Sequence, residues 1–260
     1  MKKKELSIKQ KNADKDLNII VLFTLIPLII YLVFGNSIMN FAKNSQLNIW
    51  LRFIPIILIQ FGLAGLGSLI VILYRKEKLK EYGLVKNNLF KTIMLTIIVC
   101  IPSLIFLLVN NEVKSYFPLK GCFFTKMFLN ANFPTNLLGY LLIVLIWGFM
   151  EGFNYVVISK KINDRYINKN KWFNYGAIVC GIICILIHGM IGFDLYTIFE
   201  ALTTFILIYG MLVVKENTNN AWGCILIFLL YSSFLSIFQN EKPSLIKITS
   251  LFRKYLLDKQ

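Results

Sequence analysis

The sequence predicts an all-α membrane protein, a bundle of about seven transmembrane helices, with six or eight as the alternatives. Hydrophobic residues make up 57% of the 260 residues, and the mean hydropathy is +0.66. Charged residues make up only 16%, well below the roughly 25% of a soluble domain. Apolar runs near the ~20 residues that a helix needs to cross a bilayer recur along the chain. A helix satisfies all of its own backbone hydrogen bonds in lipid, so these runs predict helices.

The chain is strongly basic, and most basic residues lie in the segments between the apolar runs. The formal net charge is +15. In a soluble protein such a charge would suggest nucleic acid, but this placement follows the positive-inside rule of membrane proteins. We therefore expect no nucleic-acid partner, and we expect the lysines and arginines to meet the anionic inner leaflet of a bilayer. The abundance of Lys, Asn and Ile is typical of an AT-rich microbial genome, so the expected location is the cytoplasmic (plasma) membrane of a microbe.

We expect one transmembrane domain, residues 17–238, between a basic cytoplasmic tail, residues 1–16, and a second basic tail, residues 239–260. The N-terminal tail is almost wholly polar, which predicts that it is solvated. Leu17–Gly35 is the first predicted span. A loop with one lysine follows it up to Ile49.

The second predicted span, Trp50–Tyr74, contains residues that bend helices or bring them close together. Pro55 lies near its start, and three glycines follow: Gly62, Gly65 and Gly67. They predict a kink and a close contact with another helix.

A basic connector, Arg75–Lys91, leads to the third predicted span, Thr92–Val109, which contains Pro102. The next segment, Asn110–Phe133, is polar and aromatic and is broken by proline and glycine. We expect it to be interfacial or re-entrant. The fourth predicted span, Thr135–Ser159, ends at two lysines that mark a membrane boundary.

The last third of the chain contains three further apolar runs. A basic segment, Lys160–Lys171, precedes the fifth predicted span, Trp172–Phe193. A very short turn begins at Asp194, and the sixth span, Leu195–Val214, follows. After a polar turn, the seventh predicted span is Ala221–Phe238.

The distribution of Lys and Arg predicts that the N-terminus lies inside. With that orientation the inner segments hold 18 basic residues and the outer segments hold 10, as the positive-inside rule requires. The C-terminal tail is the exception, since its five basic residues would then lie outside. Either the last run does not cross fully, or one more crossing is present. Within this tail Leu245–Leu257 is expected to form a surface helix.

Three ionisable residues lie inside predicted spans: Glu151, His188 and Glu200. An ionisable side chain at the bilayer centre costs roughly 2–4 kcal/mol on insertion scales, so each is a candidate functional residue. One hypothesis is that they only connect helices through hydrogen bonds. The other is that they activate water or bind an ion, with a glutamate as general base and a histidine as hydrogen-bond donor.

The expected depths of these residues in the membrane do not favour a contact between Glu151 and His188. At ~1.5 Å rise per residue, Glu151 lies about 13 Å and His188 about 25 Å from the inner ends of their spans. Straight, upright helices would keep them apart. They would meet if the fourth helix continued into the cytoplasm or if the helices tilted strongly. His188 and Glu200 each lie about 8–9 Å from the outer end, so their contact is the rival expectation.

Cys180, Cys184 and His188 recur at every fourth residue and form one stripe on a helix. The stripe is about 12 Å long, so its three residues cannot share one metal ion. We expect the cysteines to be packing residues. With a single histidine in the chain, an HExxH zinc site is excluded. We predict no metal and no cofactor.

Four stretches follow one another within residues 75–238: RKEKLKEYGLVKNNLFK, WGFMEGFNYVV, CILIHGMIGF and ILIYGMLVVKENTNNAWGCILIFLLYSS. Together they resemble the CAAX-protease and bacteriocin-processing (CPBP, or Abi) family of intramembrane endopeptidases. The first is similar to a basic family connector, the second to the EExxxR motif and the third to the FxxxH motif. The fourth is similar to the family's C-terminal motif with a histidine and an asparagine.

The resemblance implies a site on Glu151 and His188. In the family, the first glutamate is thought to activate water, while histidines and an asparagine stabilise the oxyanion. Glu151 matches the first glutamate, and His188 matches the FxxxH histidine. Tyr155, Asn154, Tyr231, Ser232 or Ser233 would have to supply further polar groups, with Glu200 as an additional candidate.

Other motif positions depart from the family pattern. The second glutamate is replaced by Gly152, the arginine by Val156, and the FxxxH phenylalanine by Cys184. The final histidine and asparagine are replaced by Phe228 and Ser232. Loss of one oxyanion donor typically lowers the rate by about 10²–10³, which makes a non-catalytic member of the family a credible alternative.

Three functions therefore stay open at the level of sequence. The first is a membrane-embedded endopeptidase that cleaves a peptide or a prenylated protein by glutamate-activated water. The second is a non-catalytic relative that acts in bacteriocin immunity or in another membrane interaction. The third is a small ion-coupled carrier that uses His188 and Glu200, although no inverted repeat supports it.

Overall fold

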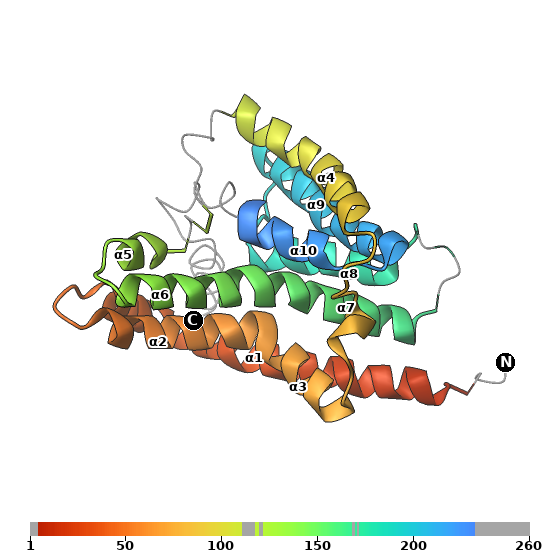
Figure 1. Ribbon diagram of the computed structural model, residues 1–260, viewed down its shortest axis with the longest axis horizontal. Coiled ribbons are helices and arrows are strands. Elements are labelled where there is room, and N and C mark those ends of the chain that lie inside the picture. Colours follow the sequence, from red (N-terminus) through yellow and green to blue (C-terminus); the bar gives the residue numbers. More distant parts are fainter. Residues whose placement is uncertain (1–4, 111–117, 120–121, 168–169, 171, 232–260) are drawn as a thin grey trace, which may run out of the picture.

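The computed structural model describes the chain except residues 1–4, 111–117, 120–121, 168–169, 171 and 232–260. The described part is helical and contains no strand, as predicted (Figure 1). Its elements in order are α1 (Ile8–Lys43), α2 (Ile49–Phe61), η1 (Gly62–Leu66), α3 (Gly67–Arg75), η2 (Leu79–Tyr82), α4 (Leu89–Val109), α5 (Thr125–Leu129), α6 (Thr135–Ile143), η3 (Val144–Met150), α7 (Glu151–Arg165), α8 (Tyr175–Ile187), α9 (Leu195–Thr218), α10 (Trp222–Leu226) and η4 (Ile227–Tyr231). The short elements η1, η3 and η4 are π-helical, and η2 is a 3₁₀-helix.

Five helical runs in the described part are long and apolar enough to cross a membrane. They are α1, the run from α2 to α3, α4, the run from α6 to α7, and α9. The fifth predicted span is shorter than expected, because α8 has only 13 residues and a length of about 20 Å. The seventh predicted span is described only as far as Tyr231. The structure thus supports a helical membrane protein, but a count of seven spans is not confirmed.

The N-terminal tail is shorter than predicted, because α1 already begins at Ile8. Ser7 caps this helix: its hydroxyl accepts a hydrogen bond from the Gln10 N–H, and the Gln10 side-chain oxygen accepts one from the Ser7 N–H. Asp16, expected in a solvated tail, is only 2% exposed and pairs with Arg75 at 2.7 Å and with Lys161 at 2.9 Å. The pairing of buried charges, which hydropathy does not register, holds this segment against the bundle.

The described helices form two groups that cross at a steep angle (Figure 1). In one group α1, the run from α2 to α3 and the run from α6 to α7 lie roughly along one direction; in the other, α9 packs against α4. Helix α8 lies along α7, and it connects the groups because it contacts both α7 and α9. The predicted close helix contact occurs at Gly67, where an added Cβ would lie 2.8 Å from the Ile20 Cα.

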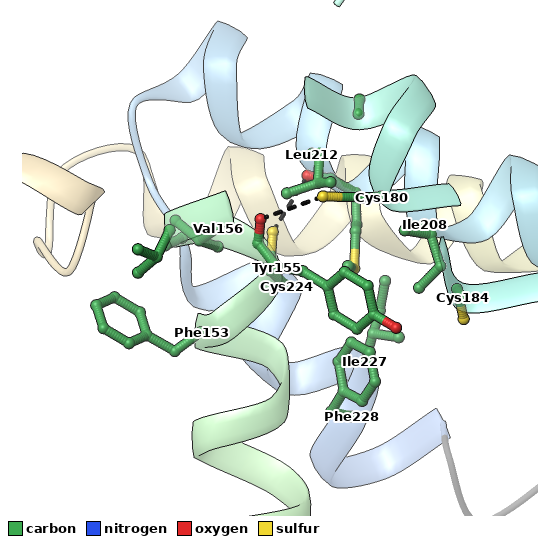
Figure 2. Packing of buried hydrophobic residues seen from close by; sticks show 14 of the residues in the cluster. Phe153, Tyr155, Val156, Cys180, Cys184, Ile208, Leu212, Cys224, Ile227 and Phe228 are labelled. Carbon is green, nitrogen blue, oxygen red and sulfur yellow. Dashed lines mark hydrogen bonds between the residues drawn. The ribbon is translucent and has the colours of Figure 1, made fainter. Parts of the chain in front are cut away.

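Two apolar clusters fill the described interior. The larger one lies where α7, α8, α9 and α10 meet, and it includes Tyr155, Val156, Cys180 and Phe228 (Figure 2). The smaller one is largely aromatic and brings together α2, α5 and η3. In it the rings of Phe53 and Phe128 lie 4.9 Å apart. This cluster holds part of the segment that was expected to be interfacial or re-entrant.

The basic connector between α3 and α4 is ordered by the turn that follows α9. The buried Asn220 side chain donates to the carbonyls of Val85 and Asn87 at 2.8 and 2.7 Å. The Ala221 N–H donates to the Gly83 carbonyl at 2.8 Å. Gly83 has φ +91°, a conformation that favours glycine. Two loops distant in sequence therefore close one end of the bundle together.

Candidate functional site

Glu151 is the first residue of α7 and directly follows the π-helix η3. Its side chain is half-buried, and its carboxylate Oε2 accepts a hydrogen bond from Gln60 Nε2 at 3.0 Å. Gln60 lies in α2, 91 positions earlier in the sequence. An amide that donates to a carboxylate offsets part of the cost of holding the charge away from water.

A second side-chain hydrogen bond joins the same two helical runs. Ser68 Oγ donates to Asn154 Oδ1 at 2.5 Å, and both side chains are buried. Glu151 and Asn154 are three residues apart and so share one face of α7. These two hydrogen bonds show that a polar face of α7 lies against α2 and α3.

The π-helix η1 lies between Gln60 and Ser68 and helps both side chains to face α7. In a regular α-helix, residues eight apart differ by about 80° in direction, at about 100° per residue. A π-turn closes from i to i+5 and therefore rotates less per residue, which reduces this offset. Ala64, inside η1, has non-helical torsion angles of φ −121° and ψ 20°. The kink predicted from the glycines is thus located at the site.

Helices α7 and α8 are antiparallel, and their contacts define a register. An added Cβ at Gly176 would lie 2.3 Å from the Ser159 carbonyl oxygen, and Cys180 Sγ donates to the Tyr155 carbonyl at 3.7 Å (Figure 2). A residue four positions later in α8 therefore lies beside a residue four positions earlier in α7. This register brings Cys184 to the level of Glu151 and His188 about one turn, or ~6 Å, beyond it.

The expected difference in depth between Glu151 and His188 was therefore wrong. It assumed that the fourth helix ends at Ser159, whereas α7 continues to Arg165 and α8 begins only at Tyr175. The continuation of this helix was one of the two conditions under which the residues were expected to approach each other. His188 is the half-buried C-terminal cap of α8. Within the described residues its ring makes no hydrogen bond or ion pair.

The cysteines of the α8 stripe are packing residues, as predicted. Cys180 and Cys184 are buried in the larger apolar cluster. Figure 2 shows the Tyr155 ring beside them, with its hydroxyl directed toward Cys184. Across the described chain, no three His, Cys, Asp or Glu side chains are placed to hold one metal ion.

Three of the positions where the sequence departs from the resembled family, Gly152, Val156 and Phe228, lie in tight packing. An added Cβ at Gly152 would lie 2.8 Å from the Cys224 carbonyl oxygen. Val156 is fully buried, and Phe228 stacks on Tyr155 with 5.4 Å between ring centroids. Glutamate at position 152 and arginine at position 156 have no room here without repacking of α7 against its neighbours.

The remaining candidate residues lie on α9, at the end of η4 or outside the described part of the chain. Glu200 is half-buried in α9. Tyr231 ends η4, and its side chain lies outside the described part of the structure, as do Ser232 and Ser233. Of the supporting residues named from the sequence, Asn154 and Tyr155 accompany Glu151 on α7.

Sequence reasoning missed Gln60 and Ser68. Gln60 carried a usable signal, because it is an amide inside an otherwise apolar predicted span, and such residues connect transmembrane helices. Ser68 carried little signal, since small hydroxyl residues are common in membrane helices.

Comparisons with models of known protein families, with curated proteins and with solved structures found no match. The description of the site therefore rests on its own geometry, and the class that this geometry defines is a helical membrane protein with a carboxylate inside the bundle.

Proposed function

We propose that this chain is an intramembrane endopeptidase of the CAAX-protease and bacteriocin-processing type. Its expected setting is the cytoplasmic membrane, with about seven spans and the N-terminus inside. The observation that carries the proposal is the register of α7 and α8, which puts His188 about one turn from Glu151 on a neighbouring helix. A peptide bond could lie between a general base and an oxyanion donor at this spacing.

In the proposed reaction Glu151 acts as the general base. Its carboxylate takes a proton from a water molecule while the water oxygen attacks the carbonyl carbon of the scissile peptide bond. The His188 ring N–H donates to the oxyanion of the tetrahedral intermediate. When the carbon–nitrogen bond breaks, Glu151 returns the proton to the leaving amine. The expected substrates are peptides or the C-termini of prenylated proteins.

The proposal is tested with the protein in lipid nanodiscs and two sets of fluorogenic peptides, prenylated C-termini and leader-type peptides. General-base catalysis contributes roughly 10²–10⁴-fold, so Glu151→Gln should lower kcat by at least about 100-fold. His188→Gln should lower kcat by about 10²–10³-fold. Thermal unfolding of each variant serves as the folding control. Full activity of a folded Glu151→Gln variant would falsify the assignment.

The packing at Gly152, Val156 and Phe228 favours a second candidate, a non-catalytic relative that confers bacteriocin immunity or acts in another membrane interaction. These positions carry charged or imidazole groups in the resembled family and apolar packing in this chain. Expression in a bacteriocin-sensitive host tests it. Protection that survives Glu151→Ala combined with His188→Ala supports this candidate, and protection that requires both residues supports the peptidase.

A further inference from the structure

We propose that Gln60 is the positioning residue of Glu151, which holds one carboxylate oxygen so that the other is presented to water. This inference rests on the proposed peptidase function, and it adds to the site a residue from a helix outside the resembled motifs. The polar atom involved is the Gln60 Nε2 amide, 3.0 Å from Glu151 Oε2.

The contact is specific within the described part of the chain. It is the only hydrogen bond there that reaches the Glu151 side chain, and it is also the only one that the Gln60 side chain makes. Both side chains are half-buried. The second oxygen, Oε1, has no hydrogen-bond donor among the described residues, which leaves it to accept a proton from water.

The surrounding backbone holds the two residues in this arrangement. Gln60 lies two residues before the π-helix η1, and Glu151 directly follows the π-helix η3. The two π-helices touch, since an added Cβ at Gly65 would lie 2.9 Å from Met150 Cε. π-turns inside helices frequently mark functional sites, because they redirect side chains at the cost of regular geometry.

The chemistry of an amide suits this role. A neutral N–H donor fixes the orientation of a carboxylate without the full positive charge of lysine or arginine, which would oppose proton uptake by the base. A well-positioned base also gains from the loss of rotational freedom before the reaction. Gln60 is therefore expected to affect kcat and to leave KM nearly unchanged, because its side chain binds the general base.

The test uses the full chain in nanodiscs and compares wild type, Gln60→Leu and Gln10→Leu. Gln10→Leu is the matched control: Gln10 Nε2 also donates from another helix to the α7 run, to the Arg165 carbonyl at 3.0 Å, but 14 residues from Glu151. Dicyclohexylcarbodiimide is the probe of the Glu151 carboxyl, and peptide mass spectrometry measures the rate of its modification. This readout does not depend on peptidase activity. If Gln60→Leu does not fold, Gln60→Met carries the same test, because it keeps the unbranched length without a donor.

We expect Gln60→Leu to change the modification rate of Glu151 at least about threefold and to lower kcat about tenfold, in line with the loss of one charge-assisted hydrogen bond. Gln10→Leu should change neither. If the modification rate changes but the wild-type protein shows no peptidase activity, the result supports the positioning of Glu151 by Gln60 and contradicts the proposed peptidase function. An unchanged modification rate in folded Gln60→Leu overturns the inference, whatever the activity.

Discussion

Lys161 is a lysine whose charge the structure buries completely. Its amine lies 2.9 Å from Asp16 Oδ2 and 2.7 Å from Glu77 Oε1, and its side chain is only 3% exposed. Asp16 also binds Arg75, and Tyr82 donates its hydroxyl to Glu77. Burial and this hydrogen bond to the Glu77 carboxylate raise the pKa of the Tyr82 phenol, so Tyr82 stays a neutral donor. The network joins α1, α3, η2 and α7.

We predict that Lys161→Met lowers the free energy of unfolding by about 3–5 kcal/mol, because it removes the buried cation that the buried Asp16 carboxylate and the half-buried Glu77 carboxylate share. Lys160→Met is the matched control. Lys160 is 21% exposed and pairs with Asp164 at 3.0 Å, so its loss should cost at most about 1 kcal/mol. Unfolding in detergent measures both. Equal stability of the two variants would show that the Lys161 network contributes no more to the free energy of unfolding than the Lys160–Asp164 pair does.

At the residue scale, the sequence identified the charges inside helices but not their partners. Glu151 was recognised because an ionisable residue in an apolar run is unusual. Its hydrogen bond to Gln60 depends on how two helices are rotated against each other, and no local pattern records that rotation.

At the scale of elements, the fit between α7 and α10 depends on Gly152. An added Cβ would approach the Cys224 carbonyl oxygen to 2.8 Å and the Ile225 Cα to 3.0 Å. Both are backbone atoms, which cannot move without a shift of the whole of α10. The glycine therefore sets the distance between these helices.

We predict that Gly152→Ala lowers stability by about 1–3 kcal/mol, the usual cost of overpacking. The control is Gly35→Ala in α1, where the nearest atoms to an added Cβ are the Tyr31 ring at 3.6 Å. This change should be neutral or stabilise the protein by up to about 1 kcal/mol, because alanine favours helices. Thermal unfolding in nanodiscs measures the stability of both variants. A Gly152→Ala protein that is as stable as the wild type would contradict the close packing of α7 against α10.

Some features of the helices could be predicted from local sequence patterns, and others could not. Prolines and glycines predicted a bend in the second span, and the bend is present at η1. The π-turn of η3 had no signal in the run VLIWGFM, since widened turns are selected by contacts with neighbouring helices. The end of α7 at Arg165 was missed because ion pairs with Lys9 and Asp14 support a helix that hydropathy places in a loop.

At the scale of the whole molecule, the orientation in the membrane can be tested at the two ends of α1. This helix has 36 residues and a length of about 54 Å, well above the ~30 Å of a hydrocarbon core. Both ends should therefore reach water. The bias of basic residues predicts that Lys9 faces the cytoplasm and Lys43 the outside.

The prediction is checked with Lys9→Cys and Lys43→Cys, each in a Cys122→Ser background, since the other cysteines are buried. A membrane-impermeant maleimide should label Lys43→Cys in intact cells, and Lys9→Cys only after the cells are permeabilised. The opposite pattern would reverse the proposed orientation and would place the basic segments outside.

A helical membrane protein with an unusual glutamate at position 151 could be predicted from the amino-acid sequence alone. Hydropathy and charge belong to single residues and their near neighbours, so they can be read without a fold. The packing of the helices was needed to show that Gln60 contacts Glu151 and that His188 lies about one turn away from Glu151. It also showed that Gly152, Val156 and Phe228 lie in close packing. These relations depend on the register, rotation and length of helices that are far apart in the chain.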